Sequence, residues 1–127
     1  MKTFTHYYVS VYYVFAGADK MKTELYSNGP ISCSIASTIK FEAYIGGIYA
    51  EKKSFPVVNH EISIVGWGFD TASGLEYWVG RNSWGAYWGE RGYFRIQMHK
   101  DNLGIETNCV AGIPSLTKVN ANKEITK

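Results

Sequence analysis

A pair of apolar runs on either side of a glycine-containing loop is the feature that most constrains the fold. The runs span residues 61–67 and 75–81, and the loop between them is Asp70-Thr71-Ala72-Ser73-Gly74. Both runs are rich in β-branched and aromatic residues, which favour strands, and a Gly-containing loop between such runs indicates a hairpin. The sequence therefore predicts an antiparallel pair of strands in this region.

The rest of the chain predicts further strands and one main helix. Strands are expected at residues 7–14, 31–35 and 92–98, a helix at residues 19–27, and a helical turn is one alternative for the ambiguous stretch 37–45. Met21 and Leu25 lie on one face of the helix, and Asn28-Gly29-Pro30 ends it because proline cannot continue a helix. We therefore expect an α+β fold dominated by β-structure, an antiparallel β-barrel-like sheet with one main helix near residues 18–28.

Composition and charge narrow the class of protein. The chain has 127 residues, of which 46% are hydrophobic and 19% charged, as expected for one globular domain. Its net charge of +2 is too small to predict binding to nucleic acid or to an anionic membrane. No apolar run reaches the length that spans a bilayer. Residues 1–18 only weakly resemble a secretory signal, because His6, Ser10 and several tyrosines make them too polar, and a strand is the favoured reading.

Cys33 and Cys109 are the only cysteines, and they are far apart in the sequence. Neither the cysteines nor the three histidines show metal-ligand spacing, so we expect no metal and no cofactor. A disulfide that closes a long loop is one alternative, and it would fit an oxidising compartment. Two buried free thiols are the other alternative.

His60 begins one predicted strand and Asn82 follows the next, which suggests a site for acid–base chemistry. An imidazole can deprotonate a thiol and later protonate a leaving amine, because its pKa lies near neutrality. A neutral amide oxygen can orient the ring without adding charge to a thiolate–imidazolium pair. Taken alone, His60 would more often be a structural histidine and Asn82 a turn residue. Only the surrounding sequence pattern supports a catalytic role for them.

That pattern resembles the papain family of cysteine peptidases, over roughly residues 7–113. The matching blocks are Asn28-Gly29-Pro30-Ile31-Ser32, Gly46-Gly47-Ile48-Tyr49, Asn59-His60, Val65-Gly66-Trp67-Gly68, Tyr77-Trp78-Val79, Arg81-Asn82-Ser83-Trp84-Gly85 and Trp88-Gly89-Glu90-Arg91-Gly92-Tyr93-Phe94-Arg95-Ile96. The resemblance implies that residues 1–127 form the C-terminal, barrel half of such a peptidase, with residues 117–127 as a frayed tail. Residues 28–33 and 46–51 resemble one carboxypeptidase-like branch of the family in particular.

The resemblance assigns roles to individual residues. His60 matches the catalytic histidine, Asn82 the asparagine that orients it, and Trp84 the indole that covers their hydrogen bond. Cys33 matches a cysteine that pairs with a late one, which corresponds to Cys109. We expect the two side chains of the His60–Asn82 pair to lie about 2.6–3.2 Å apart, and the Cα atoms of the cysteine pair about 4.4–6.8 Å apart.

The family's nucleophilic cysteine lies in a signature more than about 100 residues before the histidine. Only 59 residues precede His60, so we expect no nucleophile in this chain. Two further departures lie inside the matching region. Glu61 occupies a position that can line the pocket for the second substrate residue, where the family usually has a small or apolar residue. Gly80 replaces a β-branched residue, and a glycine inside a strand is expected to loosen it.

Three functions fit these observations. The first is the C-terminal half of a peptidase that hydrolyses peptide bonds and is inactive without its other half. The second is a non-catalytic module that binds a peptide or protein in the remaining half-cleft, and the third is a half-enzyme that assembles in trans with a separate N-terminal half. The expected partners are thus a peptide or protein substrate and the N-terminal half. The face that would contact that half predicts self-association, and the family implies a lysosomal or secreted location.

Overall fold

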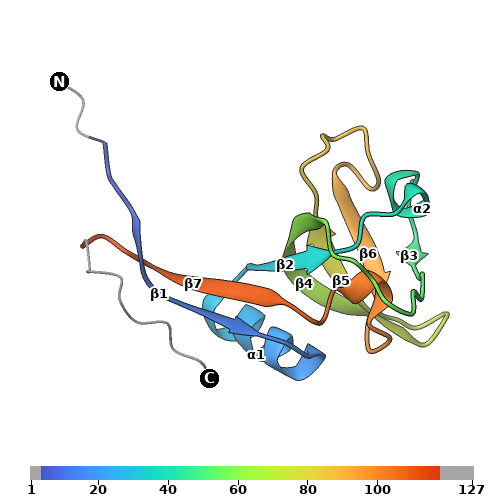
Figure 1. Ribbon diagram of the computed structural model, residues 1–127, viewed down its shortest axis with the longest axis horizontal. Helices are drawn as coiled ribbons and strands as arrows, with labels where there is room; N and C mark the ends of the chain where they lie inside the picture. The colour runs from blue at the N-terminus through green and yellow to red at the C-terminus, as the bar shows by residue number, and fades with distance from the viewer. Residues whose placement is uncertain (1–3, 118–127) are drawn as a thin grey trace.

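A single seven-stranded sheet organises the computed structural model, which describes residues 4–117 (Figure 1). The strands are β1 (Tyr8–Phe15), β2 (Ile31–Ile35), β3 (Ile48–Tyr49), β4 (His60–Asp70), β5 (Leu75–Arg81), β6 (Tyr93–Gln97) and β7 (Cys109–Ser115). The helices are α1 (Ala18–Asn28), α2 (Ile39–Glu42) and the 3₁₀ turn η1 (Asn102–Gly104). None of the helices in the described part of the chain is long and apolar enough to cross a membrane.

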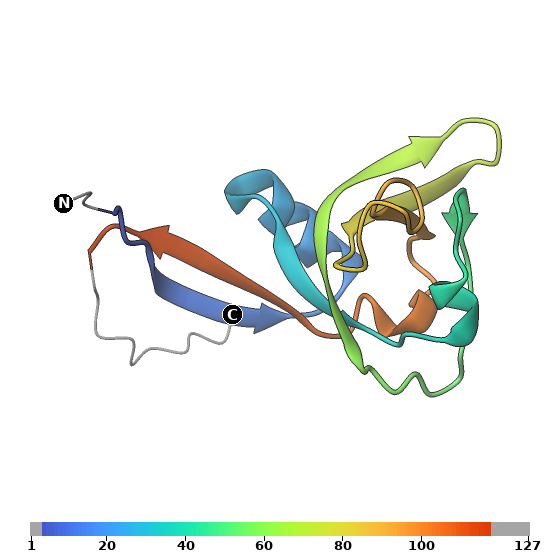
Figure 2. The ribbon, with the colours of Figure 1, turned by 90° about the horizontal axis from the view of Figure 1, so that it is seen from above.

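The strands follow the order β1-β7-β2-β4-β5-β6-β3. The neighbours are antiparallel except β3 and β6, which run parallel. The β-dominated fold with one main helix is thus confirmed. The sheet curls around the core from β4 to β3, but its end strands β1 and β3 do not pair with each other, so it stays open rather than closing as a barrel (Figure 2).

The predicted hairpin is the pair β4 and β5. Its turn is closed by a hydrogen bond from the Gly74 N–H to the Asp70 carbonyl at 2.8 Å, and Asp70 Oδ2 also accepts from the Ser73 N–H at 3.0 Å. Gly74 has φ 69°, a left-handed conformation that glycine adopts without steric cost. A bulge between Ile64 and Gly66 shifts the register of this pair.

Helix α1 buries the face that its sequence predicts. Met21 and Leu25 are buried, and they belong to the main hydrophobic core. Gly29 ends the helix in a left-handed conformation, φ 94°, and its N–H bonds to the Leu25 carbonyl at 3.2 Å. The helix therefore begins and ends within one residue of its predicted bounds.

The packing of the core explains why residue 80 is a glycine. Trp78, Phe94 and Ile64 are fully buried. A Cβ atom on Gly80 would lie 2.2 Å from Cζ of Phe94, far closer than atoms can approach. The glycine expected to loosen β5 therefore leaves the space that the Phe94 ring fills.

The predicted disulfide between Cys33 and Cys109 is present and fully buried. The two residues are directly opposite each other on β2 and β7. Their Cα atoms are 4.1 Å apart, slightly closer than expected. The reason is their place in the ladder: the adjacent Ser34 N–H bonds to the Asn108 carbonyl, so the cysteines form a non-hydrogen-bonded pair, the closer of the two kinds.

Glu76 on β5 links three parts of the chain. Its carboxylate accepts from Lys22 Nζ of α1 at 2.7 Å and pairs with His99 Nε2, after β6, at 2.6 Å. These two hydrogen bonds, from Lys22 first and then from His99, hold the pKa of Glu76 below its usual value. The expected frayed tail, residues 117–127, lies outside the described residues except for Thr117.

Candidate functional site

The strand register brings His60 and Asn82 together. His60 is the first residue of β4, and Asn82 directly follows the last residue of β5, which is the neighbouring strand. His60 Nε2 lies 2.9 Å from Asn82 Oδ1, within the distance predicted from the sequence. Asn82 is 7% exposed, and its own N–H bonds to the Gly92 carbonyl at 2.9 Å. This backbone bond and the burial of Asn82 therefore hold the amide that contacts the imidazole.

A second hydrogen bond determines which His60 nitrogen carries the proton in this pair. The Ser83 N–H donates to the same Asn82 Oδ1 at 2.8 Å, which identifies this atom as the oxygen and hence as an acceptor. His60 Nε2 must therefore donate to it. The other ring nitrogen, Nδ1, has no hydrogen-bond partner among residues 4–117 and can exchange a proton with another group.

Trp84 covers the His60–Asn82 contact. Its ring is stacked on the imidazole, with centroids 4.8 Å apart and an interplanar angle of 22°. Phe41 of α2 and Trp88 pack edge-on against Trp84 at 5.9 and 5.0 Å. Trp84 itself is 37% exposed, so the aromatic cluster covers the part-buried hydrogen bond from one side only.

Asn59 stabilises the start of β4, a role that the sequence did not indicate. Its Oδ1 accepts from the Ser37 N–H at 2.7 Å, and its own N–H bonds to the Ile35 carbonyl at 3.2 Å. Both bonds connect the residue before His60 to the end of β2. The only sequence signal for this role was the position of the asparagine, directly before the histidine at the start of a predicted strand.

Glu61 points to the opposite side of β4 from His60, towards two serines of β2. Its carboxylate oxygens accept from Ser32 Oγ at 2.5 Å and from Ser34 Oγ at 3.0 Å. A shallow, open pocket of about 290 Å³ lies here and is lined by Ser34, Val58, Asn59, His60 and Glu61. The residue predicted to line a substrate pocket thus lines one that His60 also borders.

No free thiol accompanies this pair. The only two cysteines of the sequence are Cys33 and Cys109, and both belong to the disulfide. Cys33 is fully buried and faces β7. Neither sulfur atom is therefore available to the imidazole.

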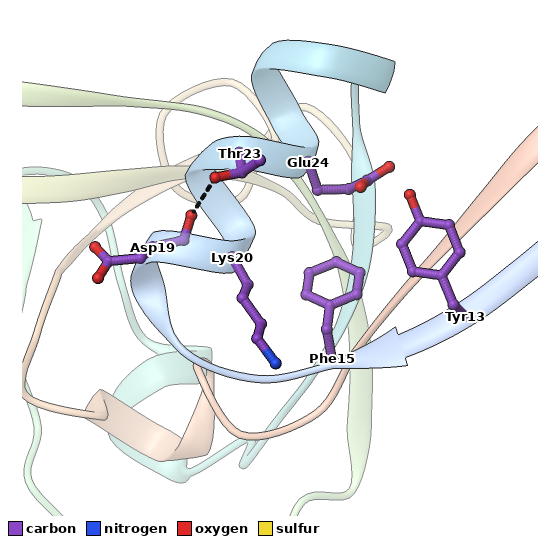
Figure 3. A pocket seen from close by; sticks show the side chains of 6 residues that line it. All are labelled: Tyr13, Phe15, Asp19, Lys20, Thr23 and Glu24. Carbon is purple, nitrogen blue, oxygen red and sulfur yellow. Dashed lines mark hydrogen bonds between the residues drawn. The ribbon is translucent and has the colours of Figure 1, made fainter. Parts of the chain in front are cut away.

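A second pocket lies between β1 and α1 and has no part in the His60 site (Figure 3). Its volume is about 340 Å³, and its walls include Phe15, Tyr13, Lys20 and Glu24. Figure 3 shows the Phe15 ring between the Tyr13 ring and the Lys20 side chain, with Glu24 pointing towards Tyr13. Glu24 is buried and accepts from Asn28 Nδ2 at 2.6 Å. The Glu24 carboxylate in this pocket is therefore held by a side chain of its own helix.

Comparison with protein families gives a match to the papain family cysteine protease model over residues 2–113. The chain is 48% identical to cathepsin Z of Onchocerca volvulus over 121 residues, which cover 90% of this chain and 39% of that protein. It is 37% identical to cathepsin B-like cysteine proteinase 5 of Caenorhabditis elegans over 115 residues, 91% of this chain and 33% of that protein. The chain therefore spans less than half the length of these curated relatives.

Solved structures share the fold. Procathepsin B S9 from Trypanosoma congolense aligns with a TM-score of 0.77 at 30% identity, over 87% of this chain and 38% of that one. The bromelain protease from Ananas comosus, in complex with the inhibitor E64, aligns with a TM-score of 0.75 at 26% identity, over 84% of this chain and 51% of that one. The open sheet described above is thus an arrangement found in longer proteases.

Proposed function

Because the chain belongs to the papain family of cysteine proteases, we propose that it is the C-terminal half of a cathepsin Z-like cysteine peptidase. The complete enzyme hydrolyses peptide bonds, and by resemblance to cathepsin Z it removes residues from the carboxyl end of its substrate. The branch resemblance at residues 28–33 and 46–51 and the identity of 48% to a cathepsin Z support this assignment.

His60 acts as the base and then as the acid of the reaction. His60 Nδ1 takes the proton from a cysteine thiol contributed by the other half, and the thiolate attacks the peptide carbonyl carbon. The tetrahedral intermediate expels the amine as the imidazolium returns the proton to its nitrogen. A water molecule, deprotonated by His60, then hydrolyses the thioester and releases the acid and the thiol.

Asn82 orients His60 throughout these steps. Its Oδ1 accepts a hydrogen bond from the His60 Nε2–H, with the two heavy atoms 2.9 Å apart. The amide is neutral, so it does not neutralise the thiolate–imidazolium pair. This hydrogen bond, with Nδ1 left for a second group, is the observation that carries the proposal. Trp84 stacks on the imidazole and limits its rotation.

The N-terminal half is the proposed partner, and the pair formed by β1 and β7 supports this. The two strands extend away from the rest of the sheet, and β1 exposes apolar side chains (Figures 1 and 2). A two-stranded ribbon is only marginally stable unless something packs on it. The disulfide fits an oxidising compartment, which agrees with a lysosomal or secreted enzyme.

The complete enzyme and the 127-residue chain should be compared on the same peptides. We expect hydrolysis by the complete enzyme and none by the chain alone, in which an epoxide thiol probe should label neither cysteine. His60→Ala in the complete enzyme should abolish hydrolysis, whereas His6→Ala, at an exposed histidine, should not change it. Full activity of the His60→Ala enzyme would contradict the proposal.

A non-catalytic peptide-binding module is the second candidate, since both cysteines of the chain are held in the disulfide. Peptide binding without cleavage by the complete protein would support this candidate. Cleavage that begins only when a separately expressed N-terminal half is added would instead support assembly in trans.

A further inference from the structure

Glu61 lines the same pocket as His60 and has no basic partner among the described residues. The side chain is exposed, and no lysine, arginine or histidine of residues 4–117 forms an ion pair with it. Its neighbour His60 is directed to Asn82 on the other side of the strand, as alternation along a strand requires. The carboxylate is therefore free of ion pairs within the described residues and faces solvent.

Two neutral hydroxyl groups fix the position of this carboxylate. Ser34 is directly opposite Glu61 on β2, and its Oγ donates to one oxygen at 3.0 Å while Ser32 Oγ donates to the other at 2.5 Å. Asn108 Nδ2 in turn donates to Ser34 Oγ at 3.2 Å, which directs the serine proton towards Glu61. A carboxylate has about four acceptor positions, so two remain for a ligand.

The pocket also has an apolar wall. Val58 lines it together with Ser34 and Glu61, and its side chain is 40% exposed. Long basic side chains place their methylene groups along such a surface while the charged group reaches a carboxylate. The pocket of about 290 Å³ thus combines the two features that arginine or lysine requires.

We propose that this pocket selects substrates with a basic side chain next to the residue that is cleaved. Glu61 receives the guanidinium or ammonium group, and Val58 contacts the stem. This specificity rests on the proposed function, because it places a substrate residue beside His60, but binding in the pocket does not require the chemical step. Ser32 and Ser34 act as positioning residues for the Glu61 carboxylate.

The test is binding of three capped amino acids to the complete protein that contains this chain. The probes are the Nα-acetyl N-methylamides of arginine, norleucine and glutamate, and the readout is the shift of backbone amide signals near residues 58–61 in NMR titrations. We expect arginine to bind about five- to tenfold more tightly than norleucine, as a charge-assisted contact at an exposed carboxylate would give. The preference should decrease as ionic strength rises.

Two variants with the same change in net charge provide the control. Glu61→Gln should abolish the preference for arginine, whereas Asp19→Asn, at an exposed residue of α1, should leave it unchanged. Ser34→Ala should reduce the preference without abolishing it, because the charge stays and its orientation is lost. Equal binding of arginine and norleucine, a preference that survives Glu61→Gln, or no binding of any probe would overturn the proposal.

Peptides acetyl-Ala-Xaa-Ala-Phe, with Xaa as arginine, norleucine or glutamate, separate this proposal from the catalytic one. Hydrolysis of any member supports the proposed function, and a higher kcat/KM for arginine supports the specificity. Preferential binding of arginine without hydrolysis would contradict the catalytic proposal, but it would still support Glu61 as the group that binds a basic side chain. Hydrolysis with no preference among the three would contradict only the specificity.

Discussion

One oxygen atom of Asn82 accepts from both His60 and Ser83, so a single side chain fixes the ring and its proton. The sequence could identify the histidine, the asparagine and Trp84, because they lie in a distinctive block of residues. It could not identify the contributions of Ser83 and Asn59. Each contribution is a hydrogen bond between a backbone N–H and an asparagine Oδ1, which depends on the folded backbone and which no residue pattern shows.

Asn82→Ala in the complete enzyme should lower kcat/KM about 10- to 100-fold, because the imidazole loses the acceptor that orients it. Peptide hydrolysis at several pH values is the measurement, with KM expected to change less than kcat. Circular dichroism should show an unchanged fold. An enzyme with full activity would show that Asn82 does not orient the catalytic base.

Gly80→Val should destabilise the protein by about 1–3 kcal/mol, because an overpacked core must displace the Phe94 ring. Urea unfolding of the wild type and the variant measures this difference. Adding Phe94→Leu to Gly80→Val should recover part of the loss, and a double-mutant cycle should show the coupling. Strictly additive effects would mean that the two side chains do not compete for the same space.

At the scale of elements, the sequence predicted α1, the β4–β5 hairpin and the strands β1, β2 and β6. It did not predict β7 or β3. Strand β7 contains Gly112 and Pro114, which usually mark a break. Pro114 is tolerated because it pairs with Val9 at a bulge, and because β2 pairs only with Cys109 and Val110 at the other end of β7. Strand β3 has only two residues and exists through its parallel pairing with β6, a contact that no local pattern reveals.

The disulfide connects β2 to β7 across 76 residues. Closing so long a loop restricts the unfolded chain, so replacing Cys33 and Cys109 together by alanine should lower the free energy of unfolding by about 2–4 kcal/mol. Equilibrium unfolding in urea is the measurement, and the wild type under reducing conditions should show a similar loss. A change below about 1 kcal/mol would mean that the crosslink contributes little.

Glu76 should make stability depend on acid pH. Its pKa is lowered in the folded state, so its contribution is complete above the usual value of 4.5 and is lost as the pH falls through the lowered folded value. The stability difference between wild type and Glu76→Gln should therefore shrink as the pH falls below 4.5. Thermal unfolding at a series of pH values tests this, and a difference that grows towards acid would contradict it.

At the scale of the whole molecule, the exposed side of β1 decides how the 127-residue chain behaves in solution. Tyr8, Val9, Tyr12 and Val14 are between 37% and 52% exposed on one strand, at the edge of the sheet. An unpaired apolar edge is a site for association with another chain.

The 127-residue chain should therefore self-associate when it is purified alone. Light scattering after size-exclusion chromatography should show a mass that increases with concentration, and Val9→Thr with Tyr12→Ser should reduce that increase. A matched pair of changes at Tyr26 and Ile39, which are exposed on helices, should have a smaller effect. A monomer at every concentration would contradict the prediction.

The place of β7 between β1 and β2 has a consequence for biosynthesis. Strands β1 and β2 are not neighbours in the sheet, and both pair with β7, which is translated after them. At about 5–20 residues per second, the ribosome needs roughly 4–15 s to proceed from Cys33 to Cys109. During that interval β1 and one edge of β2 lack their β7 partner. A chaperone could bind them then, or they could pair with the wrong strand.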